Sequence, residues 1–348
     1  MAVTEGFVDA MLAAPVGVSL LAALERRLRR GMGFGVASHS EPDAVHAAAE
    51  SVASMSFGEL VDLAVTVGVI EVGPWIPNAA ANAALAYRYA EERAPIAEAI
   101  AAHFGEALHA PLNREAQEWW VAAWPDDRPI TPLFEHYEQV YDDGQFTWAG
   151  LWTVTSPPPV THAGLLDAWE VHPAPFTRWH VPALPAARVF EIHRPADWAR
   201  LVTEHPHDAA PLLDSWALPD FADLPSDLSE ILTARGQPSR RAYEWRPLVP
   251  DWRSVAKTYD GVHLSWAGFI TAEGCIAESS AGYVTMLRYW FSERTHWLSD
   301  VFGEPEPAGG LSLPHDTSSD GRFASIDVRV DSQRRDKDAA VLGRLLGR

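Results

Sequence analysis

The sequence predicts an α+β protein in which an all-α N-terminal domain precedes a Trp-rich mixed α+β domain. Residues 1–124 are rich in alanine and carry apolar side chains at helical spacing, whereas the chain beyond them is rich in Trp, Thr and Val, which favour strands. Between the two regions, residues 125–132 contain three prolines in eight positions, and prolines at that density break a helix. We therefore expect a helical domain over 1–124, a mixed α+β domain over 126–302, and a linker, a strand and a short helix over 303–348.

Helix start and stop residues divide the first region. Thr4 can cap a first helix that runs through Leu12, and Pro15 begins a second helix that ends at the glycine-rich residues 31–35. Alanine-rich faces on such helices allow them to pack closely. The remaining helices are expected over Asp43–Met55, Phe57–Val69, Ala79–Glu92, Pro95–His109 and Asn113–Trp124.

The second region alternates between strand-forming and helix-starting stretches. Pro195 and Pro250 each open a helix with an Asp-Trp pair nearby, which places an acidic residue at the start of the helix. Over residues 282–299 we expect a helix from about Val284, and a strand over Thr285–Phe291 is the alternative. The other expected elements are strands over Thr147–Thr155, Arg188–His193, Val262–Ile270 and Phe323–Asp331, helices over His162–Trp169 and Lys337–Arg348, and a linker over Gly303–Gly321.

Charge and cysteine content exclude several classes of protein. The formal net charge is −20 and the isoelectric point is about 5.0, so repulsion from phosphates opposes a general nucleic-acid-binding role. A single cysteine, Cys275, excludes an intrachain disulfide framework. The N-terminal residues lack the basic region of a signal peptide, and no stretch has the length and composition of a membrane span. We therefore expect a cytoplasmic protein that does not associate with membranes.

Tryptophan is unusually frequent, with 15 residues, and five of them lie between Trp245 and Leu298. Buried tryptophan rings supply a large contact area but need a partner for the indole N–H. A Trp-rich core explains this content, and the alternative is that two or three rings line a ligand cleft.

Familiar catalytic and metal-binding motifs are missing from the sequence. There is no Gly-x-Ser-x-Gly, no P-loop and no Gly-x-Gly-x-x-Gly after a strand. Two Glu-x-x-His pairs, Glu106/His109 and Glu293/His296, have a spacing that suits a metal on a helix, but about one or two such pairs arise by chance in a chain with 14 histidines. We expect no metal site.

One carboxylate remains as a candidate for chemistry. Glu293 stands in Trp290-Phe-Ser-Glu-Arg-Thr-His-Trp297, between bulky aromatic residues. A carboxylate in such surroundings can bind a sugar hydroxyl or an oxocarbenium-like centre. The stretch Thr147–Ser156 ends in Thr and Ser residues and has aromatic neighbours. The enzymatic interpretation requires these two stretches to lie side by side.

This combination resembles the ADP-ribosyltransferases. In that family a mixed α+β split-sheet domain clamps NAD, and it uses a basic or His residue on one strand, a Ser/Thr or Tyr near a second, and a late Glu on the ribose. The resemblance implies that Glu293 is the catalytic residue and that NAD is a co-substrate. It implies further that the Ser/Thr position is Thr153, Thr155 or Ser156.

The chain departs from the family pattern at several positions. Arg188, the clear strand arginine, follows the Ser/Thr strand instead of preceding it, so His136 or Tyr141 would have to serve as the first element. Phe291 stands two residues before Glu293, where many members have Glu or Gln. The candidate substrate-binding residues are Trp148, Trp152, Thr153, Thr155, Ser156, Arg188, His263, Trp266 and Trp290.

Two other functions fit the sequence. The alanine-rich helical domain and the lack of a strong catalytic motif suit a non-enzymatic component of an assembly, with a protein partner bound through the helices. The tryptophans, with carboxylates such as Asp251, Asp260 and Glu293, suit a glycan-binding or glycan-cleaving protein. The sequence leaves the oligomeric state open.

Overall fold

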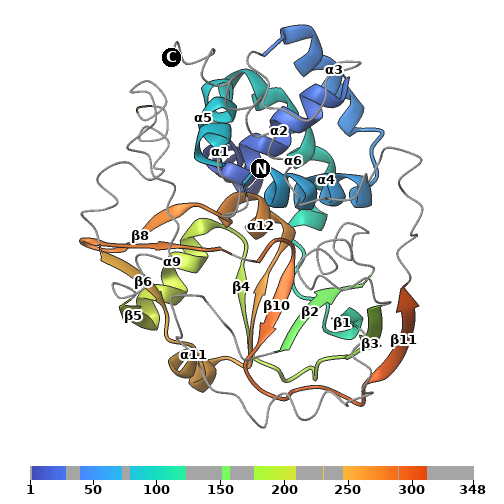
Figure 1. The fold of residues 1–348 in the computed structure, drawn as a ribbon, viewed down its shortest axis with the longest axis vertical. Coiled ribbons are helices and arrows are strands. Elements are labelled where there is room, and N and C mark those ends of the chain that lie inside the picture. Colours follow the sequence, from blue (N-terminus) through green and yellow to red (C-terminus); the bar gives the residue numbers. More distant parts are fainter. Residues whose placement is uncertain are drawn as a thin grey trace, which may run out of the picture.

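The computed structural model has the α+β architecture drawn in Figure 1. It describes residues 2–28, 40–72, 79–122, 151–156, 176–208, 230, 246–288 and 290–311. The α-helices are α1 (Ala2–Ala13), α2 (Pro15–Leu28), α3 (Pro42–Val52), α4 (Phe57–Ile70), α5 (Ala79–Arg88), α6 (Ala94–Leu108), α9 (Pro195–Glu204), α11 (Trp252–Thr258) and α12 (Trp266–Ala272), and short 3-10 helices cover Glu91–Arg93 and Arg114–Ala116.

Helices α1 to α6 form a layer above the strands, and their boundaries follow local sequence signals (Figure 1). Ser56 caps α4 through a capping box with Glu59, and Pro15 and Pro42 are the first residues of α2 and α3. The apolar faces of these helices are buried, for example at Leu20 in α2. The helices expected from the sequence between residues 4 and 109 are therefore confirmed in the described ranges.

A seven-stranded sheet lies below the helices, in the order β11-β3-β1-β2-β10-β7-β4. Its strands are β11 (Glu306–Leu311), β3 (Phe176–His180), β1 (Gln117–Ala122), β2 (Leu151–Thr155), β10 (Arg294–Trp297), β7 (Gly261–Leu264) and β4 (Val189–Ile192). Neighbours are antiparallel except for β7 and β4, which are parallel. A second, four-stranded sheet has the order β5-β6-β9-β8, with β5 (Pro206–Asp208), β6 (Arg246–Pro250), β9 (Tyr283–Met286) and β8 (Ile276–Ser280).

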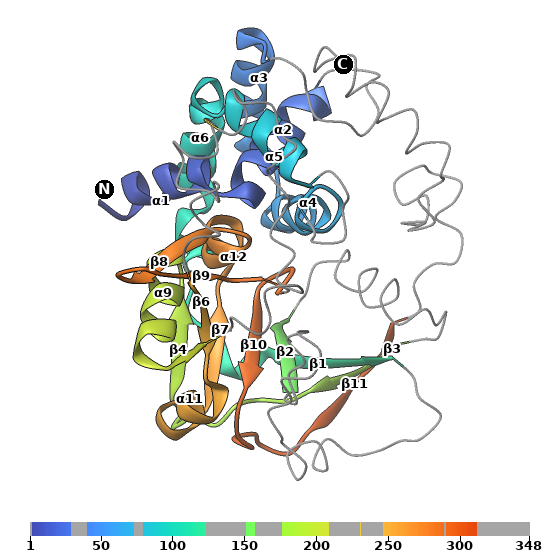
Figure 2. The same ribbon diagram turned by 60° about the vertical axis from the view of Figure 1, so that its left-hand side comes forward.

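The short helix α12 lies between the helical layer and the strands, as Figure 2 shows. Ser265 caps its start, because the Ser265 hydroxyl accepts a hydrogen bond from the Gly268 N–H at 3.1 Å. Phe269 packs against Gly68 of α4, and Gly268 lies against the backbone carbonyl of Ile192 in β4. Buried residues of the helical layer, α12 and strands β4, β6 and β7 belong to one apolar cluster, and a second, smaller cluster holds Leu151 of β2 and Trp297 of β10.

One expected element in the middle of the chain is wrong in type, and a second is correct only in its first part. The expected helix over Asn113–Trp124 is a single 3-10 turn followed by β1, which pairs with both β2 and β3. The Trp-Trp-Val run in β1 suits a strand, and pairing on both sides satisfies its backbone. The expected strand over Val262–Ile270 ends at Leu264, and α12 begins at Trp266, because a short apolar run carries no clear period.

Two expectations near the end of the chain are also wrong. The helix expected from Val284 is instead strand β9 and, after an irregular stretch, strand β10, so the alternative strand is correct in type. Phe291 has a positive φ of 60°, which a helix does not accommodate. The part of the expected linker that is described contains β11, which pairs with β3 around an irregularity at Pro307 and Gly309. The elements expected over His162–Trp169, Phe323–Asp331 and Lys337–Arg348 lie outside the described residues.

Candidate functional site

Three polar side chains from neighbouring segments meet at the β4 end of the large sheet, and we call them the Glu–His–Glu array: Glu191, His263 and Glu293. Nδ1 of His263 lies 2.5 Å from Oε2 of Glu191, and Nε2 lies 3.0 Å from Oε1 of Glu293. The side chains of His263 and Glu293 are 2% and 5% exposed, whereas that of Glu191 is 25% exposed. The array therefore runs from a buried carboxylate through a buried ring to a carboxylate that reaches solvent.

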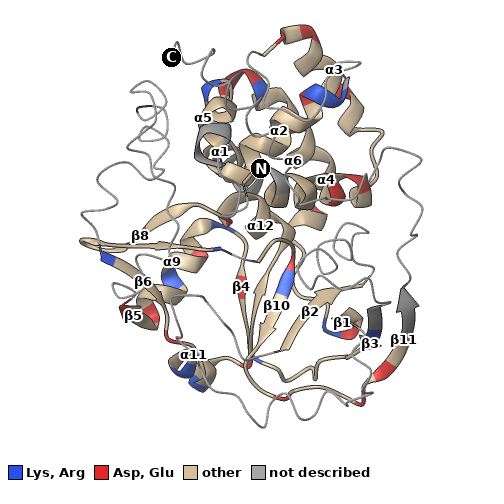
Figure 3. Ribbon diagram, viewed as in Figure 1, with Lys and Arg blue, Asp and Glu red and all other residues tan. Residues whose placement is uncertain are grey.

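Strand pairing explains why these residues meet. Glu191 of β4 is the register partner of His263 in parallel strand β7, and His263 is the partner of Thr295 in β10. Glu293 stands in the bend that directly precedes β10, two residues before Thr295, and this position brings its carboxylate to His263. Figure 3 shows an acidic band within β4 and a basic band at the start of β10, where Arg294 is the strand's basic residue.

Thr155, at the end of β2, binds the carboxylate of Glu293 directly. Its hydroxyl donates to Oε1 at 2.7 Å and its backbone N–H donates to Oε2 at 3.1 Å. With His263, these bonds hold both carboxylate oxygens. Glu293 therefore lies beside the Thr/Ser stretch, as the enzymatic interpretation requires.

A second set of hydrogen bonds links β2 to β1 and to β10. The Gln117 amide donates to the Thr155 hydroxyl at 3.1 Å and accepts from the Thr153 hydroxyl at 2.5 Å. Thr153 in turn accepts from the indole N–H of Trp297 at 2.7 Å. Thr153, Gln117 and Trp297 are all buried, so this network fixes the position of Thr155.

The array carries charge at neutral pH. Burial would lower the pKa of His263, but hydrogen bonds and charge from Glu191 and Glu293 outweigh burial and raise the pKa to about 9. Burial would raise the pKa of Glu191, but its bond from His263 and the Leu112 N–H hold that pKa below its usual range. His263 is therefore an imidazolium at neutral pH, bonded on both sides to carboxylates.

Other candidate residues contribute to packing around the array. The ring of Trp152 stacks on the ring of His296, with the two centroids 4.6 Å apart. Trp290 packs edge-on against Trp152, with the two ring centroids 4.8 Å apart. Trp290 is wholly buried, and Trp152 is half-buried. Trp266 begins α12 and packs on Phe269. These tryptophans belong to the core.

Two candidates bind other partners, and some fall outside the described residues. Arg188 pairs with Asp260 at 2.9 Å in an exposed position before β4, away from Glu293. The Ser156 hydroxyl donates to Glu118 at 2.5 Å. Trp148, His136 and Tyr141 lie outside the described residues.

The sequence interpretation missed Glu191 and Gln117. Each is a polar residue in a strand with bulky apolar neighbours, Val-Phe-Glu-Ile in β4 and Gln-Glu-Trp-Trp-Val in β1. A carboxylate inside such a strand is a signal of a buried polar partner, because an unpaired buried charge is costly. The partner, His263, is 72 residues away in the sequence.

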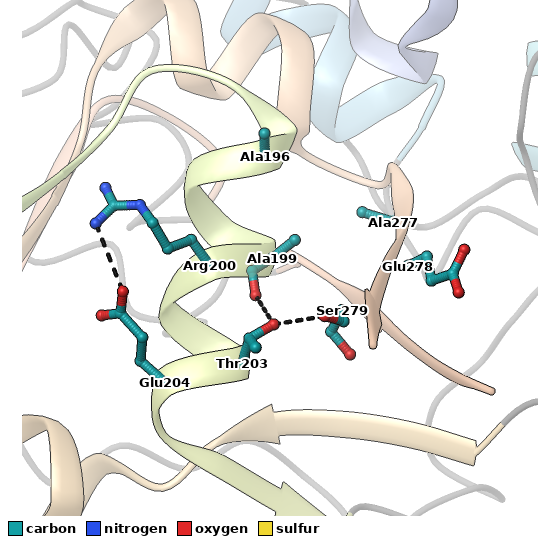
Figure 4. Close-up of a pocket in the computed structure, with 8 residues that line it drawn as sticks. All are labelled: Ala196, Ala199, Arg200, Thr203, Glu204, Ala277, Glu278 and Ser279. Atoms are coloured by element: carbon teal, nitrogen blue, oxygen red, sulfur yellow. Dashed lines mark hydrogen bonds and ion pairs between the residues drawn. The ribbon is translucent and has the colours of Figure 1, made fainter. Parts of the chain in front are cut away.

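The pocket whose lining residues are drawn in Figure 4 lies between α9 and β8, and none of these residues belongs to the array. Its walls combine small side chains with an exposed ion pair between Arg200 and Glu204. The hydroxyl oxygen of Thr203 lies 2.7 Å from the carbonyl oxygens of both Ala199 and Ser279, so its single proton is shared between the helix and the strand. In the part of the chain that is described, no group of three or more His, Cys, Asp or Glu residues is placed to hold a metal ion.

The pKa shifts predict a maximum of stability near pH 6.5. The raised pKa of His263 adds stability that is fully present below about pH 6.5 and is lost as pH rises through about 9, on the order of 3 kcal/mol. Burial lowers the pKa of His296 to about 3. Below about pH 6.5, His296 therefore binds a proton in the unfolded chain but not in the folded protein, and stability falls as pH falls. Urea unfolding as a function of pH should show that the free energy of unfolding falls on both sides of this maximum. His263→Gln should reduce the fall on the alkaline side. A wild-type unfolding free energy that stays constant from about pH 6.5 to 9 would contradict the assignment.

Comparisons with known proteins give no relative: no family model, no curated protein and no solved structure matches the chain. Among the described helices, none is by itself long and apolar enough to cross a membrane, and α1 and α2 reach that length only as a pair bent by 89°.

Proposed function

We propose that the protein is an ADP-ribosyltransferase-like enzyme that uses NAD or a related nucleotide, with Glu293 as the carboxylate that binds the ribose. The observation that carries the proposal is the pair of hydrogen bonds from Thr155 to Glu293, at 2.7 and 3.1 Å. It joins the Ser/Thr position to the late glutamate, the two positions on which the family resemblance rests. The residues at the first position of the family pattern, His136 or Tyr141, enter the proposal from the sequence alone.

The chemistry suits a carboxylate held in this way. Cleavage of the bond between the ribose and nicotinamide sends the bonding electron pair to the nicotinamide nitrogen and leaves positive charge on the ribose, until water or an acceptor group adds to C1′. A fixed anion close to that charge stabilises the transition state more than the ground state. The two donors of Thr155 hold the Glu293 carboxylate in one orientation, so little reorganisation is needed.

The two alternative functions receive less support. A glycosidase needs free space between two carboxylates for the glycosidic bond, or for a water molecule as well. The ring of His263 occupies the space between Glu191 and Glu293. A partner-binding helical surface would carry exposed apolar residues, but Leu184, outside the helices, is the exposed large apolar residue among those described.

Incubation of the full-length protein with NAD tests the proposal. We expect release of nicotinamide and a rise in melting temperature with NAD or ADP-ribose. Glu293→Gln should lower the rate by more than about 100-fold while the far-UV spectrum remains that of the wild type, because glutamine keeps the shape and loses the charge. Glu304→Gln, which changes an exposed carboxylate outside the array, is the matched control. The proposal is wrong if the wild-type protein releases no nicotinamide and neither ligand shifts its melting temperature.

The proposal extends to the location of the protein. We infer a cytoplasmic enzyme, because NAD is available there and the single cysteine of the chain, Cys275, is a buried thiol with no second cysteine to form an intrachain disulfide.

A further inference from the structure

Glu191 has no part in the function proposed above, yet it makes the shortest hydrogen bond of the array. Its Oε2 lies 2.5 Å from Nδ1 of His263, on the opposite side of the ring from Glu293. Its Oε1 accepts the backbone N–H of Leu112 at 3.1 Å, so the carboxylate is held at both oxygens. Both carboxylate oxygens of Glu191 therefore bind donors inside the protein, although the side chain is 25% exposed.

The position of Glu191, together with Glu293, determines the protonation of the two ring nitrogens of His263. A neutral imidazole has one N–H, and a proton on Nδ1 alone would turn the Nε2 lone pair toward Glu293, which is repulsive. With carboxylates 2.5 and 3.0 Å from its two nitrogens, the ring is stable when both nitrogens are protonated. Nε2–H of His263 then donates a hydrogen bond to Glu293, and this bond helps to keep the carboxylate beside Thr155.

Glu191 also sets the charge of the array. His263 as an imidazolium and Glu293 as a carboxylate would together be neutral. The second carboxylate makes the sum −1 when both glutamates are ionised. A negative array attracts a developing cation, and a neutral pair does so only weakly at close range.

Charged and titratable groups on the described elements surround the array, and one of them, Arg294, is a cation that partly offsets its negative charge. His193, which directly follows β4, shares a hydrogen bond of 2.9 Å with the Ser265 hydroxyl, and burial lowers its pKa, so it is neutral at neutral pH. His109, which follows α6, faces His193 with ring centroids 6.2 Å apart, and Asp197 of α9 is a further charge near His193. Arg294 of β10 is the cation nearest Glu293 in the chain; burial lowers its pKa to about 10, and the charges of Glu273 and Glu293 oppose that effect.

We propose that Glu191 is a positioning residue that holds His263 as an imidazolium with Nε2–H directed at Glu293, and that keeps the array net negative. This inference rests on the proposed function where it concerns turnover, and on the array geometry alone where it concerns His263. As a consequence, Glu191, at the solvent-facing end of the array, controls the orientation of the Glu293 carboxylate through His263.

The direct test is the titration of His263 in the full-length protein, followed by nitrogen-15 NMR and assigned with His263→Gln. In the wild type we expect both ring nitrogens to remain protonated up to about pH 8. Glu191→Gln should lower the midpoint by at least about one pH unit, a tenfold loss of proton affinity. Glu191→Asp, which keeps the carboxylate, should recover part of that loss, and Glu304→Gln should leave the midpoint unchanged.

Turnover of NAD gives the second readout. Glu191→Gln should lower kcat by about tenfold or more and leave KM within about twofold, because the lost charge acts on the transition state. A role in folding alone would leave the kcat of the folded variant unchanged.

The two proposals fail in different ways. Absence of NAD turnover by the wild type overturns the proposed function, and the NMR titration then decides the inference by itself. An unchanged His263 midpoint in Glu191→Gln overturns the inference whatever the activity, and so does an unchanged kcat in that variant beside an inactive Glu293→Gln. If Glu191→Gln does not fold, the wild-type titration still decides, because a His263 midpoint at or below about pH 6.5 overturns the inference.

Discussion

Gly268→Ala is expected to destabilise the protein by about 3 kcal/mol or more, although alanine is the better helix former. A Cβ at position 268 would overlap the backbone carbonyl of Ile192 and would lie 2.7 Å from Cδ1 of Leu264. That carbonyl cannot easily move, because it accepts from the backbone N–H of Ser265 at 3.1 Å and from its hydroxyl at 3.2 Å. The substitution therefore pushes α12 away from β4, next to Glu191.

Gly105→Ala is the matched control. Gly105 lies within α6, and a Cβ built there meets nothing within 4 Å. Alanine should raise the free energy of unfolding by up to about 1 kcal/mol, because it restricts the unfolded chain and favours the helix. Urea unfolding of both variants measures the contrast, and a Gly268→Ala protein as stable as the wild type would show that α12 does not pack as closely as described.

Arg93→Met is expected to cost about 3 to 5 kcal/mol of stability. The side chains of Arg93 and Glu25 are both 0% exposed, and Nε of Arg93 donates to Glu25 at 2.7 Å. Arg93 also donates to the carbonyl of Ala86 at 3.1 Å. Methionine fills a similar volume, so the main loss is the charge that neutralised Glu25 inside the helical layer.

The double variant Glu25→Gln/Arg93→Met separates the loss of the pair from the loss of packing. Because no buried charge is left unpaired, it should be more stable than Arg93→Met alone. Thermal and urea unfolding of the wild type, both single variants and the double variant close the cycle. Strictly additive effects would mean that Glu25 and Arg93 do not interact as an ion pair.

The helices were predictable from the sequence because their signals are local. Ser56 with Glu59 three residues later marks the start of α4, and Pro15 marks the start of α2. The strands near Trp119 and Thr285 were harder, because aromatic and β-branched residues in short runs carry no unique period. Their type was decided by partners far away in the sequence, such as β3 for β1.

The candidate site was predictable only in part, for the same reason. Glu293 was identifiable as a carboxylate among aromatic residues, and Thr155 as a hydroxyl at a strand end. Glu191 was not, because its role depends on a parallel pairing of β4 with β7 that no local pattern encodes. Arg188 was conspicuous as a strand arginine, and its ion pair with Asp260 likewise joins residues 72 positions apart.

The place of α12 between the helical layer and the strands has a consequence for synthesis of the chain. Helices α1 to α6 leave the ribosome long before α12, which packs against α1, α2 and α6. Until then, the apolar surface that α12 covers is open to water. A nascent chain that stops short of residue 266 therefore presents a surface for chaperones or for aggregation, and completion of the native state waits for the C-terminal part of the chain.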